Sequence, residues 1–179
     1  PVQIDCGRVN GRGFLNVSGS GFDVDVLQKT EELKKVYSGE KAYHKAVISV
    51  IERYKAFEAE LSVDGKPATH EACTIIEIAN GQYIGGGMRV APEAEMDDGM
   101  FDVVVVRKVP RLCIPFLLPL FMLGWHTKLG LARVMRAKRV SLRAKGMTLN
   151  VDGKLVTADH ADYELLPGAI RMMRPQKIG

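Results

Sequence analysis

The sequence predicts a mainly β domain of the α+β class, an antiparallel β-sandwich with a few helices packed on one side. Two observations predict it. Most of the chain consists of short strand-like runs separated by Gly, Asn-Gly and Asp-Gly turns. Strands and helices do not alternate regularly, as they would in a fold with a parallel sheet. The 179 residues are 46% hydrophobic and 26% charged, a balance typical of one globular domain over residues 1–179.

The N-terminal part predicts a hairpin and one further strand. Gly7–Val17 contains the turn Asn10-Gly11 between short apolar segments. Phe14–Val17 is typical of a buried strand, which runs into the glycine cluster Gly19–Gly21. We interpret that cluster as a tight turn, because the Gly-Lys-Ser/Thr that completes a phosphate-binding loop is absent.

Two helices and two strands are predicted next. Val24–Val36 is weakly helical, and Glu40–Tyr54 carries apolar residues at helical spacing. Phe57–Val63 alternates between apolar and polar residues, as a half-buried strand does. Cys73–Ala79 is almost continuously apolar, which indicates a strand covered on both faces.

The segment Cys113–Trp125 is apolar and is broken by Pro115, Pro119 and Gly124. It is too short to span a bilayer, which takes about twenty residues. Two interpretations are open: a helix buried in the core, or a helix that lies against a membrane surface. A short amphipathic helix is expected to follow at Lys128–Met135.

The rest of the chain is predicted to form strands. Val103–Val106, a run of consecutive valines, is the clearest strand in the sequence. Further strand-like segments are Val140–Ala144, Thr148–Lys154 with a turn at Asp152-Gly153, Tyr163–Pro167 and Ala169–Pro175.

Positive charge is concentrated in one part of the chain. The net charge is +4, and no Asp or Glu lies between Asp102 and Asp152. The basic residues of this stretch are Arg107, Lys108, Arg111, Lys128, Arg133, Arg136, Lys138, Arg139, Arg143 and Lys145. Such a stretch attracts phosphates or an anionic membrane surface, unless it is only a solvated basic face. No aromatic-interleaved recognition motif accompanies it, so we expect no nucleic-acid partner.

Several kinds of site are excluded or disfavoured. Three unclustered cysteines argue against a disulfide framework and indicate a reducing cytoplasm. The four histidines form no helical His-x-x-x-His pair, and no Gly-x-Ser-x-Gly elbow is present. The chain begins at Pro1 without a charged-then-apolar leader, so we expect a fragment or a processed chain.

Three carboxylates that precede a glycine at a strand end remain as candidates: Asp64, Asp98 and Asp152. Each is most simply a turn residue. Asp152 is distinguished because it directly follows the basic stretch. A general base among cations, beside apolar surface, is what phosphorylation of a lipid hydroxyl requires.

A resemblance to a known family narrows this interpretation. Asn80–Asp102 combines three glycine turns, one of them Gly85–Gly87, and Phe14–Asp23 precedes it while Val151–Lys154 and Pro167–Pro175 follow. In this order the segments resemble the C-terminal domain of the soluble diacylglycerol kinase-like lipid kinases, which are related to sphingosine kinases and NAD kinases. The resemblance covers nearly the whole chain. It implies a lipid-binding β-sandwich, with the N-terminal nucleotide-binding domain and its Gly-Gly-Asp-Gly-Thr motif missing from this chain.

The resemblance also implies roles for individual residues. Asp152 matches the family aspartate that activates the acceptor hydroxyl. Gly153 and Lys154 match a Gly-Glu pair near nucleotide and metal, and Lys154 reverses the charge of that glutamate. Two interpretations are open: Lys154 meets a phosphate directly, or the protein has an altered substrate. Gly85–Gly87 would allow close backbone approach at the cleft between the two domains.

Metal and headgroup contacts are implied as well. Asp98 matches a carboxylate that holds a structural Mg²⁺ in some family members, with backbone carbonyls near Glu95 and Met100. Asp25 lies where related sphingosine kinases recognise the lipid headgroup. Mg²⁺ is therefore the expected cofactor, and ATP the co-substrate, bound mainly by the missing domain.

The expected function is that of the C-terminal half of an ATP-dependent lipid kinase of the diacylglycerol kinase type, inactive alone. The alternative, suggested by Lys154, is a non-catalytic lipid- or membrane-binding module. Expected partners are a lipid substrate, an anionic membrane surface and the missing nucleotide domain, and a homodimer is left open. The predicted location is cytoplasmic and peripheral to the membrane. Diacylglycerol, a sphingoid base, phosphatidylglycerol and an undecaprenol-like alcohol are all open as acceptors.

Overall fold

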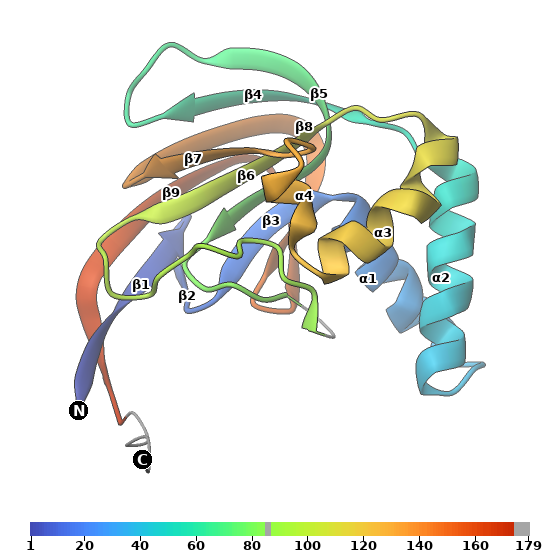
Figure 1. The fold of residues 1–179 in the computed structure, drawn as a ribbon, viewed down its shortest axis with the longest axis horizontal. Helices are drawn as coiled ribbons and strands as arrows, with labels where there is room; N and C mark the ends of the chain where they lie inside the picture. Colours follow the sequence, from blue (N-terminus) through green and yellow to red (C-terminus); the bar gives the residue numbers. More distant parts are fainter. Residues whose placement is uncertain (85–86, 174–179) are drawn as a thin grey trace.

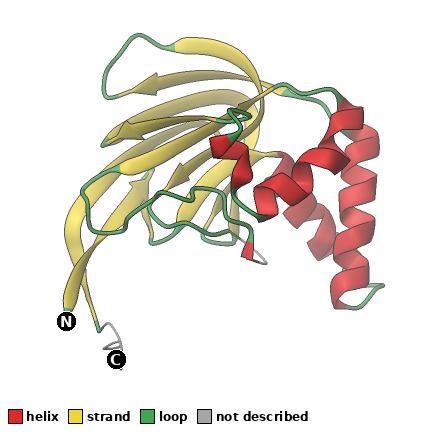
Figure 2. Ribbon diagram, viewed as in Figure 1, coloured by secondary structure: helices red, strands yellow, loops and turns green. Residues whose placement is uncertain are grey.

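The computed structural model describes residues 1–84 and 87–173 and confirms the predicted fold class. Its strands form one antiparallel sheet, and its helices gather on one side of that sheet (Figures 1 and 2). The strands are β1 Val2–Val9, β2 Arg12–Phe14, β3 Val17–Gly21, β4 Phe57–Val63, β5 Thr69–Ala79, β6 Phe101–Arg107, β7 Arg133–Ala137, β8 Arg139–Val151 and β9 Lys154–Met172. The helices are α1 Phe22–Leu33, α2 Gly39–Arg53, the 3-10 turn η2 Arg111–Cys113, α3 Ile114–Met122 and α4 Trp125–Lys128.

The sheet curls because two strands bridge its long members. The strand order is β2-β1-β9-β8-β3-β5-β6-β7, and β4 lies off this path. β3 pairs with the end of β5 and the end of β8, whereas β4 pairs with the start of each. The strands β5 and β8 are therefore joined by β3 at one end and by β4 at the other, which gives the sheet a sandwich-like shape.

Two apolar cores form on the two faces of the central strands. The first is enclosed by the curled sheet and includes Ile76, Leu142 and Leu149. The second lies between the helices and the opposite face of the sheet, and it includes Ile75 and Val104. Alternate residues of β5 and β6 therefore belong to different cores, which explains why both strands are apolar on both faces.

The helix predicted over Lys128–Met135 is wrong. Only Trp125–Lys128 is helical in this part of the chain, and Arg133–Ala137 forms β7. β7 pairs with β6 along its whole length. Backbone hydrogen bonds to an available sheet edge, together with the burial of Ala137, outweigh the weak helical periodicity of the segment.

The glycine cluster Gly19–Gly21 is not a tight turn. Gly19 lies inside β3, directly opposite Glu77 of β5. Gly21 is the residue before α1 and adopts φ 127°, a conformation that favours glycine. The cluster therefore serves a close strand contact and the start of a helix.

The core-helix interpretation of Cys113–Trp125 applies to one face of α3: Ile114 and Phe121 belong to the second core, and Leu117 and Leu118 pack against it. In α3 only Ile114 and Phe121 are buried, and Phe116 is 79% exposed. Among residues 1–84 and 87–173, no helix combines the length and apolar character needed to cross a bilayer.

We expect Gly19→Ala to destabilise the fold by about 2–3 kcal/mol, because the site has no room for a methyl group. A Cβ there would lie 2.0 Å from Oε2 of Glu77 and 2.5 Å from the carbonyl oxygen of Ile76. Gly13→Ala is the matched control, since the nearest atom to its Cβ would be 3.7 Å away. Urea denaturation measures both variants, and equal stabilities would contradict the prediction.

Candidate functional site

The hairpin between β8 and β9 presents Asp152 at one end of the sheet. Asp152 and Gly153 adopt φ 47° and 88°, the left-handed pair that a two-residue hairpin turn requires. The N–H of Gly153 also donates to Oδ1 of Asn150 at 2.7 Å. The Asp-Gly sequence thus fixes the backbone that carries the Asp152 side chain.

Three backbone N–H groups anchor the carboxylate of Asp152. Oδ2 accepts from Leu15 at 2.6 Å, and Oδ1 accepts from Asn16 at 3.1 Å and from Val17 at 3.0 Å. The predicted strand Phe14–Val17 is therefore interrupted at Leu15 and Asn16, whose donors serve the carboxylate. An ionised carboxylate has about four acceptor positions. Asp152 is exposed and keeps acceptor capacity toward solvent.

The first turn of the glycine-rich span packs against this anchor. The fully buried side chain of Asn80 donates from Nδ2 to the carbonyl oxygen of Leu15 at 2.8 Å. The backbone N–H groups of Asn80 and Gly81 both donate to the carbonyl oxygen of Asn16. A Cβ on Gly81 would lie 2.1 Å from Oδ1 of Asn16, so this glycine permits the close approach. Segments far apart in the chain thus converge at Asp152.

A second acidic group lies between α1 and β5. Glu77 of β5 is only 1% exposed, and its carboxyl interacts with that of Asp23 in the first turn of α1. One oxygen of each, Oε1 of Glu77 and Oδ1 of Asp23, has no hydrogen-bond partner. Asp25 lies in the same first turn. The absence of a side chain at Gly19 leaves the space that the Glu77 carboxyl fills.

Burial decides the protonation of this group. It raises the pKa of Glu77 well above its ordinary value, and the negative charge of Asp23 adds to the effect. Burial also raises the pKa of Asp23, against which the hydrogen bond with Glu77 and the N–H groups at the start of α1 act. Glu77 is therefore the member that holds a proton. The Asp25 carboxyl is partly shielded from water. This desolvation and the negative charge of Asp23 raise the pKa of Asp25 to about 6.

Sequence reasoning predicted Asp25 but missed Asp23 and Glu77. A signal for Glu77 was present, because it is the one charged residue in the apolar run Cys73–Ala79. A carboxyl in a strand covered on both faces has to be buried, and a buried carboxyl needs a partner or a proton. No comparable signal in the sequence pointed to Asp23 as that partner.

The residues around Asp98 do not fit a bound Mg²⁺ as the structure has them. Oδ2 of Asp98 pairs with the guanidinium of Arg136, which also contacts Asp102 at 3.2 Å. Oδ1 of Asp98 accepts the N–H of Met100. A cation between Asp98 and the carbonyls near Glu95 would have to displace Arg136. In the part of the chain that the structure describes, no cluster of three metal-ligating side chains is present. The metal site stays a prediction.

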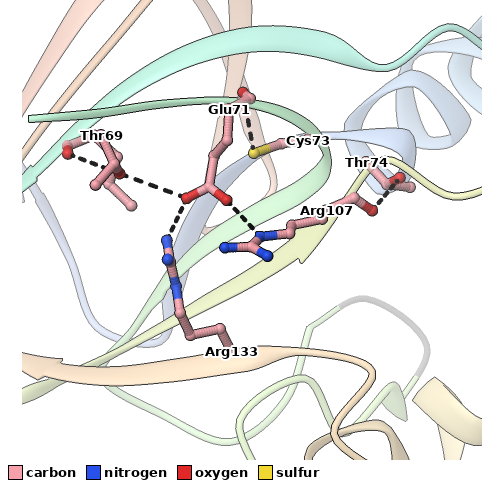
Figure 3. A network of polar contacts seen from close by, with 7 residues as sticks. Thr69, Glu71, Cys73, Thr74, Arg107 and Arg133 are labelled. Atoms are coloured by element: carbon pink, nitrogen blue, oxygen red, sulfur yellow. Dashed lines mark hydrogen bonds and ion pairs between the residues drawn. The ribbon is translucent and has the colours of Figure 1, made fainter.

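The basic stretch is partly neutralised by a residue outside it. Figure 3 shows the carboxylate of Glu71, on β5, between Arg107 of β6 and Arg133 of β7. Its contact with Nε of Arg107 measures 2.8 Å. Burial opposes ionisation of Glu71, but the hydrogen bond from Arg107 and the charge of Arg133 outweigh it and lower the pKa of the carboxyl. The charges of these arginines, like that of Arg136, are therefore partly neutralised by carboxylates.

The structure places the remaining predicted residues, Asp64 and Lys154, in or directly beside a turn. Asp64 is a turn residue at φ 49° whose Oδ1 accepts the N–H groups of Lys138 and Arg139. Lys154 follows Gly153 at the start of β9, is exposed, and forms no ion pair within the described ranges. The predicted close approach at Gly85 and Gly86 falls on residues outside the described ones.

The family model described as the YegS C-terminal NAD kinase beta sandwich-like domain matches residues 16–174. The chain belongs to this family. The match includes the Asp152 hairpin, the glycine-rich span and the pair formed by Glu77 and Asp23. Each of these features therefore lies within the YegS C-terminal domain.

Individual relatives of this YegS C-terminal domain carry related names. "Diacylglycerol kinase" of Mycobacterium tuberculosis is 26% identical over 178 residues, which cover 97% of this chain and 57% of that protein. "Probable lipid kinase YegS-like" of Pseudomonas fluorescens is 32% identical, with the same coverage. A crystal structure of a diacylglycerol kinase from Bacillus anthracis has a TM-score of 0.61 at 18% identity, over 93% of this chain and 51% of that one, and shares the fold. The chain thus spans little more than half the length of these proteins.

We expect Glu77→Gln to change how stability depends on pH. Because the pKa of Glu77 is raised in the folded state, the folded protein holds a proton that the unfolded chain releases above about pH 4.5. Stability therefore falls as the pH rises from about 4.5 to the raised folded-state pKa. Glutamine removes that penalty. The free energy of unfolding of the variant should therefore exceed that of the unmodified chain, by a difference that grows by up to about 1.4 kcal/mol per pH unit above pH 4.5.

Urea denaturation at several pH values tests this expectation. Glu40→Gln, at an exposed position on α2, is the control and should follow the unmodified chain. Parallel stability curves for Glu77→Gln and the unmodified chain would show that Glu77 titrates as an ordinary glutamate.

Proposed function

We propose that this chain is the lipid-binding, acceptor-activating half of an ATP-dependent lipid kinase of the diacylglycerol kinase type. The observation that carries the proposal is the anchored and exposed carboxylate of Asp152 beside the glycine-rich span. Membership of the YegS C-terminal family and relatives named as diacylglycerol or lipid kinases support it. Transfer itself requires a nucleotide-binding domain, so this chain alone is expected to be inactive.

Asp152 acts as the general base in this proposal. Its solvent-facing lone pairs accept the proton of the lipid hydroxyl as the hydroxyl oxygen attacks the γ-phosphorus of ATP, and ADP leaves. The anchor from Leu15, Asn16 and Val17 holds the carboxylate still, which favours a fixed geometry for the reacting oxygen. Mg²⁺ bound with ATP would neutralise developing phosphate charge.

Two further groups of this chain complete the proposed site. Lys154, one residue beyond the hairpin turn, supplies a positive charge for a phosphate next to Asp152. Asp25, with its pKa raised to about 6, lies at the exposed edge of the acidic group and would hydrogen-bond a hydroxyl of the lipid headgroup.

A second candidate function is a lipid-binding module without catalysis. The observation that favours it is Lys154, which has no ion-pair partner among the described residues and stands where the family places a glutamate. This alternative predicts that lipid binding persists, and that phosphorylation is absent even when a nucleotide-binding domain is supplied.

Asp152→Asn distinguishes the two, and we expect it to lower phosphorylation of diacylglycerol at least about 100-fold. The assay follows ATP-dependent phosphate transfer by this chain joined to the N-terminal domain of a diacylglycerol kinase. The amide keeps the side-chain shape but cannot accept the proton.

Asp64→Asn is the matched control. Asp64 has the same left-handed turn before a glycine and also binds two backbone N–H groups, so the two variants should lose similar stability, about 1 kcal/mol each. Only Asp152→Asn should lose activity. Near-normal turnover by Asp152→Asn would remove the proposed role.

A further inference from the structure

The segment around α3 and α4 carries several exposed large apolar side chains, which we call the apolar corner. Phe116 is 79% exposed, Leu112 77%, and Trp125 and Leu123 54% each. The members of the apolar corner are Leu112, Phe116, Met122, Leu123, Trp125 and Leu129. Figure 1 shows α3 and α4 on the helical side of the molecule, away from the two chain ends. So many exposed large apolar groups within one short segment of the chain indicate an interaction site.

The inner side of the same segment is firmly attached to the protein. His126 is fully buried and its ring stacks on Phe121 with 3.9 Å between centroids. Nε2 of His126 lies 2.9 Å from the carbonyl oxygen of Val90, at the glycine-rich span. Burial lowers the pKa of His126, so the ring is neutral and compatible with this apolar setting. The apolar corner is therefore held in place by one face while it exposes the other.

Positive charges border the apolar corner. Lys108, Arg111 and Lys128 are exposed, and none of them is ion-paired in the part of the chain that the structure describes. Arg111 only donates to the backbone carbonyl of Glu52. Two carboxylates lie close, because Glu93 and Asp102 line the same pocket as Lys128, and Asp102 is paired with Arg136. The sequence otherwise contains no Asp or Glu between residues 102 and 152.

We propose that the apolar corner docks on the surface of an anionic lipid bilayer. Its apolar side chains would enter the boundary between headgroups and acyl chains, while the flanking lysines and arginine contact lipid phosphates. The charge pattern selects this occupant, since an apolar centre with a cationic rim matches an anionic bilayer better than a neutral protein surface. The segment would enter the bilayer only to a shallow depth, because α3 and α4 are nine and four residues long.

The inference rests on the proposed function for its purpose, since a lipid kinase acts on a membrane lipid, whereas the charge pattern selects the bilayer. Docking would bring a membrane-resident acceptor lipid to the protein without requiring the lipid to leave the bilayer. Vesicle binding and phosphate transfer are separate measurements. Binding without transfer removes the proposed kinase role and leaves this inference standing, and transfer without binding does the reverse.

Trp125 provides the test, because it is the single tryptophan of the chain and belongs to the apolar corner. Vesicles of phosphatidylcholine mixed with phosphatidylglycerol are added to the chain, and the tryptophan emission is recorded together with co-sedimentation. We expect binding, a shift of the emission to shorter wavelength and protection from acrylamide. Vesicles of phosphatidylcholine alone, or added salt, should weaken all three.

Variants locate the contact. Phe116→Ser with Leu123→Ser should lower vesicle affinity at least about tenfold, because two exposed apolar side chains no longer enter the bilayer. Lys108→Gln with Lys128→Gln should lower it several-fold, and only for anionic vesicles. Met173→Ser is the matched control, since Met173 has the same exposed fraction as Phe116, 79%, but follows the end of β9. The control should bind like the unmodified chain.

Three results would overturn the proposal. Absence of vesicle binding is the first. The second is binding that leaves the Trp125 emission unchanged, which would mean that another surface docks. The third is a Trp125 already protected without vesicles, either in a dimer that Phe116→Ser dissociates or when a nucleotide-binding domain is joined to the chain. In those cases a second copy or that domain covers the apolar corner.

Discussion

The anchor between the Asp152 carboxylate and the N–H groups of Leu15, Asn16 and Val17 sets the position of β3, on which the rest of the structure depends. β3 lies between β5 and β8, and its register decides which residues face each core. A shift by one residue would move a side chain into the place of Gly19 and leave no room for the Glu77 carboxyl. The anchor therefore supports both the exposed and the buried acidic groups.

Sequence patterns predicted the features of the fold that depend only on residues close together in the chain. The Asp152-Gly153 turn and the two-faced strand Cys73–Ala79 follow from turn geometry and from apolar runs, and both were recognisable. The errors concern contacts between distant segments. Gly19 looked like a turn because its reason for being glycine, the carboxyl of Glu77, lies on another strand. Lys128–Met135 looked helical because the free edge of β6 is not visible in the sequence.

The same limit applies to charge. A stretch without acids suggested a continuous positive surface, yet antiparallel pairing brings Glu71 beside Arg107 and Arg133. Pairing with a carboxylate reduces the field of those arginines in the surrounding water. The cations without ion-pair partners among the described residues include Lys108 and Lys128, which flank the apolar corner. Folding thus divides one basic stretch into a structural part and a part available to a partner.

The chemistry of α3 explains why its outer face is a surface and not an incomplete core. Pro119 lies inside the helix and has no N–H to donate, so the carbonyl of Pro115, four residues earlier, lacks its helical partner. A buried carbonyl in that state would be costly. Both prolines are exposed, where water can bind the free carbonyl. Water is also present among lipid headgroups, so shallow docking leaves that hydrogen bond intact, whereas burial against a dry protein surface would remove it.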